Sequence, residues 1–119
     1  MRMLTVTFER FTVVRVPFPF TDRTATKNRP ALVLSDATVF NSITGHSVMA
    51  MITSANNAPW PLDCPLEDLA AAGLPSPSKV RFKLFTLDDR LVRSELGRLA
   101  QVDEQNVHNA LSKLLGVIL

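Results

Sequence analysis

Residues 11–35, FTVVRVPFPFTDRTATKNRPALVLS, contain two apolar segments that flank a polar and basic loop. In the first segment, Phe11–Phe18, apolar side chains alternate along the chain, and this period of two predicts a β-strand. Pro17 lies at its end, where a residue without an amide hydrogen stops the hydrogen-bonded ladder. The continuous apolar run Ala31–Leu34 predicts a second, buried strand. We therefore expect Thr21–Asn28 to form a loop between two strands.

The rest of the chain continues with short segments of the same kind. Asp103 is a candidate N-cap for a C-terminal helix, and Gly73 is a typical cap at the end of a short one. The expected elements are strands over Val48–Thr53, Val80–Leu87 and Leu91–Leu99, a turn at Asn41–Gly45, a short helix over Pro65–Gly73, and a last helix in which Val107, Leu111, Leu114 and Ile118 share one face. Short strands, long loops and one terminal helix are typical of a small, strongly bent antiparallel sheet or barrel.

The composition predicts one folded domain over residues 1–119. Hydrophobic residues make up 46% of the chain and charged residues 20%, a balance that argues against disorder. The single cysteine, Cys64, excludes an intramolecular disulfide and a zinc site built on thiolates, and we expect it to be a packing residue. Residues 1–7 are too short and too polar for a signal peptide, and no apolar run approaches the roughly 20 residues of a membrane span. We expect a cytoplasmic protein with no membrane partner.

Several kinds of catalytic site are disfavoured by the sequence. The net charge of +2 mildly favours an anionic partner. The carboxylates show no metal-ligand spacing, and with only four glycines there is no glycine-rich phosphate loop, so we expect no metal and no cofactor. His46 and His108 have no motif around them, which argues against a histidine acid–base pair. The candidates for chemistry are therefore arginine, lysine and hydroxyl side chains.

Two places along the chain bring polar groups to the ends of apolar strands. Arg29 stands directly before Pro30, which biases its backbone towards an extended conformation. An arginine on a stiff strand loses less freedom when it binds a phosphate than one on a loop. Thr53 and Ser54 end another strand with two hydroxyls that can reach an anionic ligand. Simpler roles stay open, namely a salt bridge between Arg29 and Asp22 and hydroxyls that satisfy amides of the local turn.

A third candidate is a basic stripe. Lys79, Arg81 and Lys83 alternate along a predicted strand and therefore share one of its faces. Such stripes hold phosphate backbones and make binding sensitive to salt. The alternative is an ordinary solvated face, because Asp88, Asp89 and Glu95 are near enough in sequence to offset much of this charge.

The order of these motifs resembles the PemK/MazF-type toxins. The resemblance covers the chain from about residue 9 to its end, and residues 1–8 look like an N-terminal extension. The matching segments are Glu9-Arg10, VPFPFTD at 16–22, KNRPALVLS at 27–35, Met51–Ser54, Phe85–Asp88 and Leu96–Leu99. Several motifs in the right order are far more specific than one motif alone.

The resemblance implies an SH3-like barrel, a mainly β fold with a C-terminal helix, that forms a homodimer and cuts single-stranded RNA at short sequences without a metal. It assigns Arg29 and Thr53 to the scissile phosphate and implies products with 2′,3′-cyclic phosphate and 5′-hydroxyl ends. The cutting is expected to inhibit translation and growth. The expected protein partner is a cognate antitoxin, and operator DNA is expected to be bound only by the toxin–antitoxin complex. The other expected substrate-binding residues are Thr21, Asp22, Arg23 and Lys27 of the first loop, Ser54, and Lys79, Arg81 and Lys83 of the stripe.

Two departures from the family pattern and two rival functions complete the prediction. Many members carry Gly and an acid where this chain has Phe11-Thr12, and some carry an acid and Gln where it has Phe82-Lys83. One rival is a CcdB-like gyrase poison, which would use the apolar tail 114–119 but lacks the terminal tryptophan of such toxins. The other is a non-catalytic barrel that binds RNA or a peptide, since one fold serves many functions. Arg29 together with Thr53 favours the nuclease over both.

Overall fold

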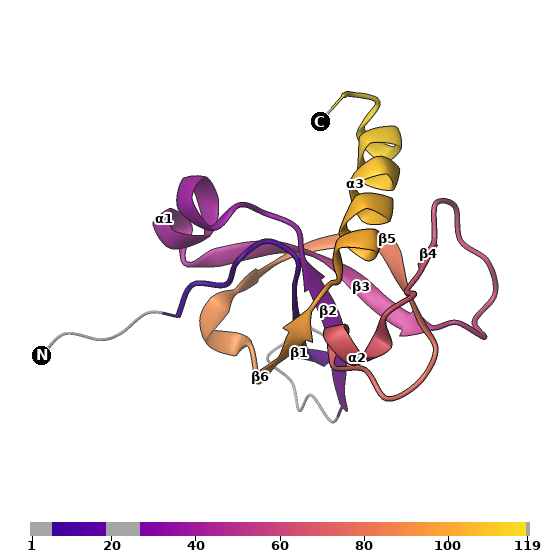
Figure 1. Cartoon of the computed structure of the whole chain (residues 1–119). Coiled ribbons are helices and arrows are strands. Elements are labelled where there is room, and N and C mark those ends of the chain that lie inside the picture. The colour runs from indigo at the N-terminus through magenta and orange to yellow at the C-terminus, as the bar shows by residue number, and fades with distance from the viewer. Residues whose placement is uncertain (1–5, 19–26, 119) are drawn as a thin grey trace, which may run out of the picture.

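The computed structural model describes residues 6–18 and 27–118. They form one antiparallel sheet in the order β4-β5-β3-β2-β1-β6, followed by a long helix (Figure 1). The strands are β1 Thr12–Phe18, β2 Lys27–Val33, β3 His46–Ser54, β4 Cys64–Pro65, β5 Ser78–Asp88 and β6 Ser94–Arg98. The helical segments are the π-helical η1 Ala37–Asn41, α1 Ser42–Thr44, α2 Leu69–Ala72, the 3-10 turn η2 Asp89–Leu91 and α3 Gln101–Leu115. The predicted class, mainly β with a C-terminal helix, is confirmed.

The sheet is strongly curled, as an SH3-like half-barrel requires. The register between β1 and β6 shifts at Val13/Val14, and that between β3 and β5 shifts at Met49/Met51. Such irregularities bend a strand and increase its twist. In none of the described helices is there a segment long and apolar enough to cross a membrane.

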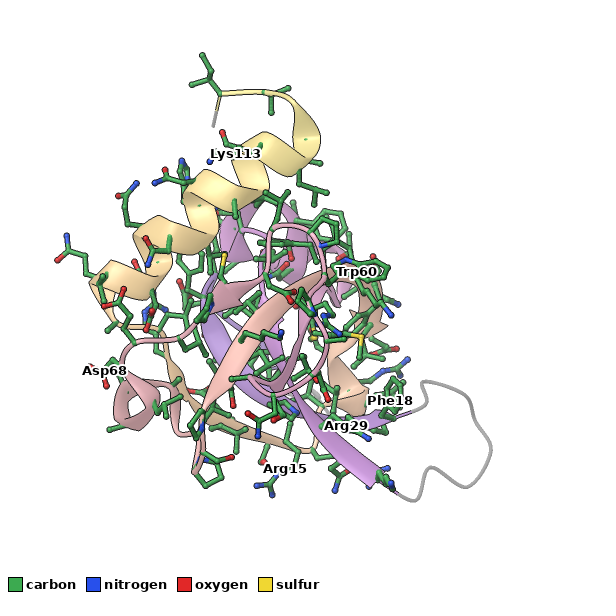
Figure 2. All side chains as sticks on the ribbon, turned by 90° about the vertical axis from the view of Figure 1, so that its right-hand side faces the viewer. Arg15, Phe18, Arg29, Trp60, Asp68 and Lys113 are labelled. Atoms are coloured by element: carbon green, nitrogen blue, oxygen red, sulfur yellow. The ribbon has the colours of Figure 1, made fainter. Side chains whose placement is uncertain are left out.

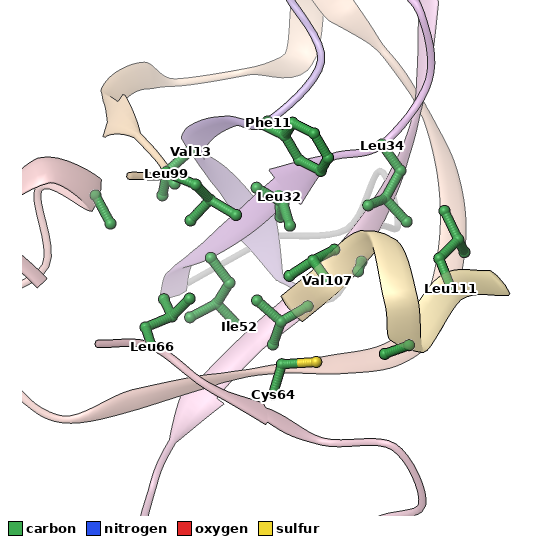
Figure 3. Close-up of a cluster of buried hydrophobic side chains, with 14 of the residues drawn as sticks. Phe11, Val13, Leu32, Leu34, Ile52, Cys64, Leu66, Leu99, Val107 and Leu111 are labelled. Carbon is green, nitrogen blue, oxygen red and sulfur yellow. The ribbon is translucent and has the colours of Figure 1, made fainter. Parts of the chain in front are cut away.

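One face of the sheet packs against α3, and we call it the covered face. Side chains from five strands, β1 to β5, meet Val107, Ala110 and Leu111 of the helix in one buried cluster (Figure 3). The sheet contributes chiefly Val13, Leu32, Ala50, Ile52, Val80 and Phe82. The predicted helix stripe is correct only in part, because Leu114 is 39% exposed and Ile118 is 99% exposed. The helix therefore extends past the core that holds its first half.

The other face, which we call the open face, is apolar only in part. The residues that alternate with those of the covered face form a second buried cluster of Val14, Val16, Ala31, Val33, Met49 and Leu87, with Phe8 from the N-terminal segment. On the same face, β2 carries Arg29 two residues from Ala31, and β3 carries Thr53 four residues from Met49, in place of buried apolar side chains. The open face thus changes from apolar to polar along its strands.

β2 begins earlier than we predicted, at Lys27, so Asn28 belongs to the strand and not to the loop. Pro30 lies inside β2, opposite Arg15 of β1. This position is tolerated because the pairing with β3 extends only over Ala31–Val33, so no described strand needs an amide hydrogen from Pro30 on that side.

The helices also differ from the prediction in detail. α3 begins at Gln101 with Ala100 as its N-cap, so Asp103 is not the cap. Asp103 is instead 1% exposed and accepts hydrogen bonds from the backbone amides of Glu67 and Asp68 at 2.9 and 3.0 Å. It therefore joins α3 to the segment before α2. Asn41–Gly45, predicted as a turn, is helical up to Thr44.

The short helix α2 is only four residues long, because Pro65 pairs in β4 and Asp68 provides the N-cap. Gly73 ends it with φ of 72°, as predicted. A Cβ on Gly73 would lie 2.0 Å from the carbonyl oxygen of Leu96, and one on Gly97 would lie 2.4 Å from that of Ala71. Both glycines are therefore required for α2 to lie directly on β6.

Phe11 adopts the left-handed conformation, with φ of 71°, that glycine favours. Its amide donates to the carbonyl of Val33 at 2.7 Å, and its own carbonyl accepts from Leu99 at 3.1 Å. The ring is buried in the cluster under α3, and the Arg10 guanidinium lies 4.4 Å from its centroid. Phe11 therefore combines a strained backbone with a buried aromatic ring at the position where many family members carry glycine.

Candidate functional site

Arg29 and Thr53 occupy corresponding positions on neighbouring strands. The last paired residues of β2 and β3 are Ala31 and Met51. Continuing this antiparallel register by two residues places Arg29 opposite Thr53, and both then lie on the open face because side chains alternate with a period of two. Val16 of β1 is opposite Arg29, and Lys79 of β5 is opposite Thr53. The pairing of β2 with β3 itself extends only over Ala31–Val33, so Arg29 and Thr53 are at corresponding positions of this register but are not paired with each other.

The Arg29 side chain is exposed and has an aromatic neighbour on its own face. Its guanidinium carbon lies 5.3 Å from the centroid of the Phe18 ring in β1. Lys27, which is opposite Phe18, is also exposed. A guanidinium over an aromatic face loses side-chain freedom while its N–H groups stay available to a ligand. Figure 2 shows Phe18 and Arg29 on the same side of the molecule.

Thr53 is oriented by a residue that the sequence did not point to. Its hydroxyl oxygen accepts a hydrogen bond from the side-chain amide of Asn57, in the loop that follows β3. Because the oxygen is the acceptor there, the hydroxyl proton is left to donate elsewhere. Asn57 therefore fixes the orientation of the Thr53 hydroxyl.

Lys79 and Arg81 converge on Asp63, a carboxylate of the same loop. The Lys79 ammonium lies 3.1 Å from Asp63 and donates to the Asn57 carbonyl at 2.7 Å. Arg81 donates to Asp63 at 3.0 and 3.2 Å and to the Ala58 carbonyl at 2.6 Å. Burial would raise the pKa of Asp63, but hydrogen bonds from Arg81 and Lys79 keep it below its usual range, and Asp63 in turn raises the pKa of Arg81. The group is charged at neutral pH and carries one net positive charge.

The three members of the basic stripe share a face, as their alternation predicts, but they are not equally exposed. Lys79 is 6% exposed and is directed at Asp63, whereas Lys83 is exposed and places its ammonium 4.4 Å from the centroid of the Trp60 ring. Arg81 lies 5.9 Å from the same ring. In this structure Lys79 and Arg81 hold the loop, and their contact with substrate stays a prediction.

Comparison with known proteins places this arrangement in a family. The model of PemK-like, MazF-like toxins of type II toxin–antitoxin systems matches residues 9–115. The chain belongs to this toxin family. Among curated proteins, no relative matches the sequence.

Solved structures agree with this assignment. A chain of a MazE-MazF crystal structure (Form III) from Deinococcus radiodurans is 26% identical, with a TM-score of 0.74 over 94% of this chain and 99% of that one. MazF (Form I) from the same organism is 25% identical, with a TM-score of 0.71 and the same coverage. An endoribonuclease in complex with its cognate antitoxin, from a mycobacterial species, has a TM-score of 0.71 over 93% of this chain and 95% of its own. At 17% identity this last likeness concerns the fold alone.

Other expected site residues of this toxin lie elsewhere or outside the described part of the chain. Ser54 alternates onto the covered face, opposite Ser78, and its hydroxyl accepts from the Asn56 amide at 3.2 Å. This is the local turn role that we had kept as an alternative. Thr21, Asp22 and Arg23 fall in 19–26, outside the described residues, and the proposed salt bridge between Arg29 and Asp22 falls there too.

The remaining candidates have structural roles. Cys64 is buried in the core under α3, and burial, together with Asp63 and Asp103, raises the pKa of its thiol, as suits a packing residue. Phe82, which stands where some members carry an acid, is 7% exposed in the same core. The imidazole of His46 contacts the Thr44 carbonyl at 2.9 Å and that of His108 lies 3.5 Å from Arg10, so the two histidines serve different elements.

Sequence reasoning missed three residues of the site, Asn57, Trp60 and Asp63. They all lie in the loop between β3 and β4, which carried no recognisable motif beyond the two prolines on either side of the tryptophan. Their roles depend on contacts with β3 and β5, and such contacts become visible only when the sheet is assembled.

Proposed function

We propose that this chain is a metal-independent endoribonuclease that cuts single-stranded RNA, with Arg29 and Thr53 at the scissile phosphate. The proposal is supported by the register of β2 and β3, which, continued by two residues, brings a guanidinium and an oriented hydroxyl to corresponding positions on the open face. Family membership supports it, because structural neighbours of this fold include proteins described as endoribonucleases.

The chemistry follows from where charge develops. When a ribose 2′-hydroxyl attacks the adjacent phosphorus, negative charge builds up on the non-bridging oxygens. Arg29 donates two hydrogen bonds to these oxygens and Thr53 donates one, and groups fixed before the reaction stabilise such charge most effectively. The 2′-hydroxyl gives up its proton as its oxygen bonds to phosphorus, the bond from phosphorus to the 5′ oxygen of the next nucleotide breaks, and that oxygen takes up a proton. The products therefore carry a 2′,3′-cyclic phosphate and a 5′-hydroxyl.

The surroundings of this pair suit a polyanion. Lys27 and Lys83 are exposed on the same face as Arg29, and the group of Lys79, Arg81 and Asp63 adds one net positive charge. Contacts of this kind release counterions, so RNA binding is expected to weaken steeply as salt rises. A flat salt response would remove the lysines and Arg81 from the binding surface.

The toxin is further proposed to act in the cytoplasm as a homodimer, to inhibit translation and growth by cutting mRNA, and to be neutralised by a cognate antitoxin. One structural neighbour is described as an endoribonuclease in complex with its cognate antitoxin and another as MazE-MazF, which supports such a partner here. Operator DNA is proposed to be bound only by the toxin–antitoxin complex.

One digestion tests the central proposal. Purified protein is incubated in EDTA with a long single-stranded RNA and with a DNA of the same sequence, and the ends are mapped. We expect cut RNA with cyclic phosphate ends and intact DNA. Intact RNA across many sequences would overturn the proposal, and inhibited gyrase supercoiling in the same preparation would favour the gyrase poison instead.

A further inference from the structure

Trp60 is an exposed tryptophan held in a rigid frame. It is 42% exposed, although it is the only tryptophan of the chain and one of its largest apolar side chains. Its amide donates to the Asp63 carboxylate at 3.0 Å, and the Asp63 amide donates back to the Trp60 carbonyl at 3.1 Å. Between them Leu62 adopts the left-handed conformation with φ of 67°. Strained conformations of this kind persist where the surroundings fix them, often at binding sites.

The frame is anchored to the open face. The same Asp63 carboxylate accepts from Lys79 and Arg81, so the turn that carries Trp60 is fixed to β5 through two cations. Pro59 and Pro61 on either side of the tryptophan reduce its backbone freedom further. The backbone that carries the ring is therefore fixed before any ligand arrives, so less entropy is lost when a ligand packs on it.

Two cations lie against the ring, and the candidate site of Arg29 and Thr53 lies nearby. Lys83 and Arg81 are 4.4 and 5.9 Å from its centroid. Arg81 is two residues along β5 from Lys79, the residue opposite Thr53, which is roughly 7 Å of strand length. An aromatic surface beside phosphate-binding cations is the combination with which proteins hold unpaired nucleotides, the ring stacking on a base and the cations contacting the backbone.

We propose that Trp60 forms a stacking subsite for a nucleobase of single-stranded RNA next to the phosphate held by Arg29 and Thr53. The substrate class rests on the proposed function, but the subsite itself requires binding only, not cleavage. Because every base has a flat face, this subsite adds affinity for an unpaired strand with little choice of sequence. It also disfavours duplexes, whose bases are stacked on each other.

The single tryptophan makes the subsite directly measurable. Short 2′-O-methyl oligoadenylate, oligouridylate and oligocytidylate lack the attacking hydroxyl and cannot be cut, so they serve as probes of binding. We expect them to quench Trp60 fluorescence as they saturate the protein, whereas inorganic polyphosphate displaces them without quenching. Fluorescence that stays constant while a labelled oligonucleotide binds, or no binding of any of the three, would overturn the inference.

Three variants distinguish stacking of a base on the Trp60 ring from contact with the loop without stacking. W60F keeps an aromatic face and is expected to retain most of the affinity, while W60L and W60A are expected to bind the labelled oligonucleotides about 5- to 100-fold more weakly. Thermal melting checks that each variant is folded. Equal affinity of W60L, W60F and the unaltered protein would contradict a stacking role.

The same variants distinguish failure of this subsite from failure of the nuclease. Loss of uniform binding raises KM and leaves kcat nearly unchanged, so W60L is expected to cut long RNA with a higher KM. Cutting that is identical in W60L, without quenching in the unaltered protein, would remove the subsite and leave the nuclease. Quenching by oligonucleotides in a protein that cuts no RNA would keep the subsite and remove the nuclease.

Discussion

Ile52 and Thr53 are neighbours in β3, yet they lie on opposite faces of the sheet. Ile52 contributes to stability, and Thr53 belongs to the candidate site. Ile52 is 1% exposed and packs under α3 on the covered face. Thr53 is partly exposed on the open face, where its hydroxyl is held by Asn57. A period of two thus lets one strand supply stability with every second residue and a site with the others. The two faces are expected to respond differently to substitution.

The largest expected effect is on the covered face. I52A removes buried methyl groups and leaves a cavity, so it is expected to lower the free energy of unfolding by about 2–5 kcal/mol. T53V at the next position is expected to cost about 1 kcal/mol or less, because it removes one partly exposed hydrogen bond. Urea unfolding measures both. Equal losses of stability would remove the distinction between the faces.

On the open face the expected loss is in rate. R29A removes two donors from the phosphate, and losing such stabilisation typically lowers the rate by about 10²–10³. Arg15 offers a matched control, because it is an exposed arginine of the neighbouring strand that alternates onto the other face. R15A is expected to cut RNA at the unaltered rate. A folded R29A protein with full activity in the EDTA digestion would exclude the central role of Arg29.

The next effect concerns the contact between α3 and the segment before α2. D103N replaces one of two buried carboxylate oxygens with an amide that faces a backbone N–H, so one donor loses its partner. An unpaired buried donor costs about 1–3 kcal/mol. The loss should appear in urea unfolding, while RNA cutting per folded molecule should be unchanged. An unaffected midpoint would show that this carboxylate is dispensable.

Phe11 allows a finer comparison between two variants. F11A and F11G both lose the buried ring, but only alanine keeps the steric strain of a left-handed conformation. F11G is therefore expected to be more stable than F11A by about 1–2 kcal/mol, although glycine normally weakens a strand. Thermal melting of the two proteins measures the difference. If F11A is the more stable variant, the backbone at this position is not strained.

The smallest expected effect is the pH dependence of the stability that Asp63 contributes on the open face. The pKa of Asp63 is lowered in the folded protein, so its ion pairs contribute stability above the ordinary pKa of about 4 and lose it as pH falls through the lowered pKa. The stability difference between the unaltered protein and D63N is therefore expected to be constant above about pH 4 and to shrink as the pH falls below that value. A difference that is constant with pH would mean that the ion pairs of Asp63 with Lys79 and Arg81 do not stabilise the fold.

Local patterns predicted the sheet well and the site only in part. The alternation in Phe11–Phe18 and the apolar run Ala31–Leu34 indicated β1 and β2, and Gly73 indicated the end of α2, because each depends on neighbours in sequence. Arg29 and Thr53 were selected by motif, and their joint action at one phosphate stays a prediction, because the β2–β3 pairing ends two residues before them.

What the sequence did not show depends on residues far apart in the chain. Asp103 has the right residue type for an N-cap, but its partners are amides 35 and 36 residues away. Lys79 and Arg81 looked like a free stripe because their counter-ion, Asp63, lies in a loop without a motif. Capping and charge patterns are local rules, and a long-range contact can override them.

The part of β2 that pairs with β1 alone determines how a ligand can bind beside it. Between Lys27 and Pro30 this strand pairs with β1, and no described strand pairs with its other side. An exposed strand edge of this kind can pair with a strand of another molecule. A proline, which has no amide hydrogen, and a charged lysine both disfavour such pairing. A ligand arriving here must therefore be recognised through side chains, which leaves Arg29 accessible and guards the protein against self-association into fibrils.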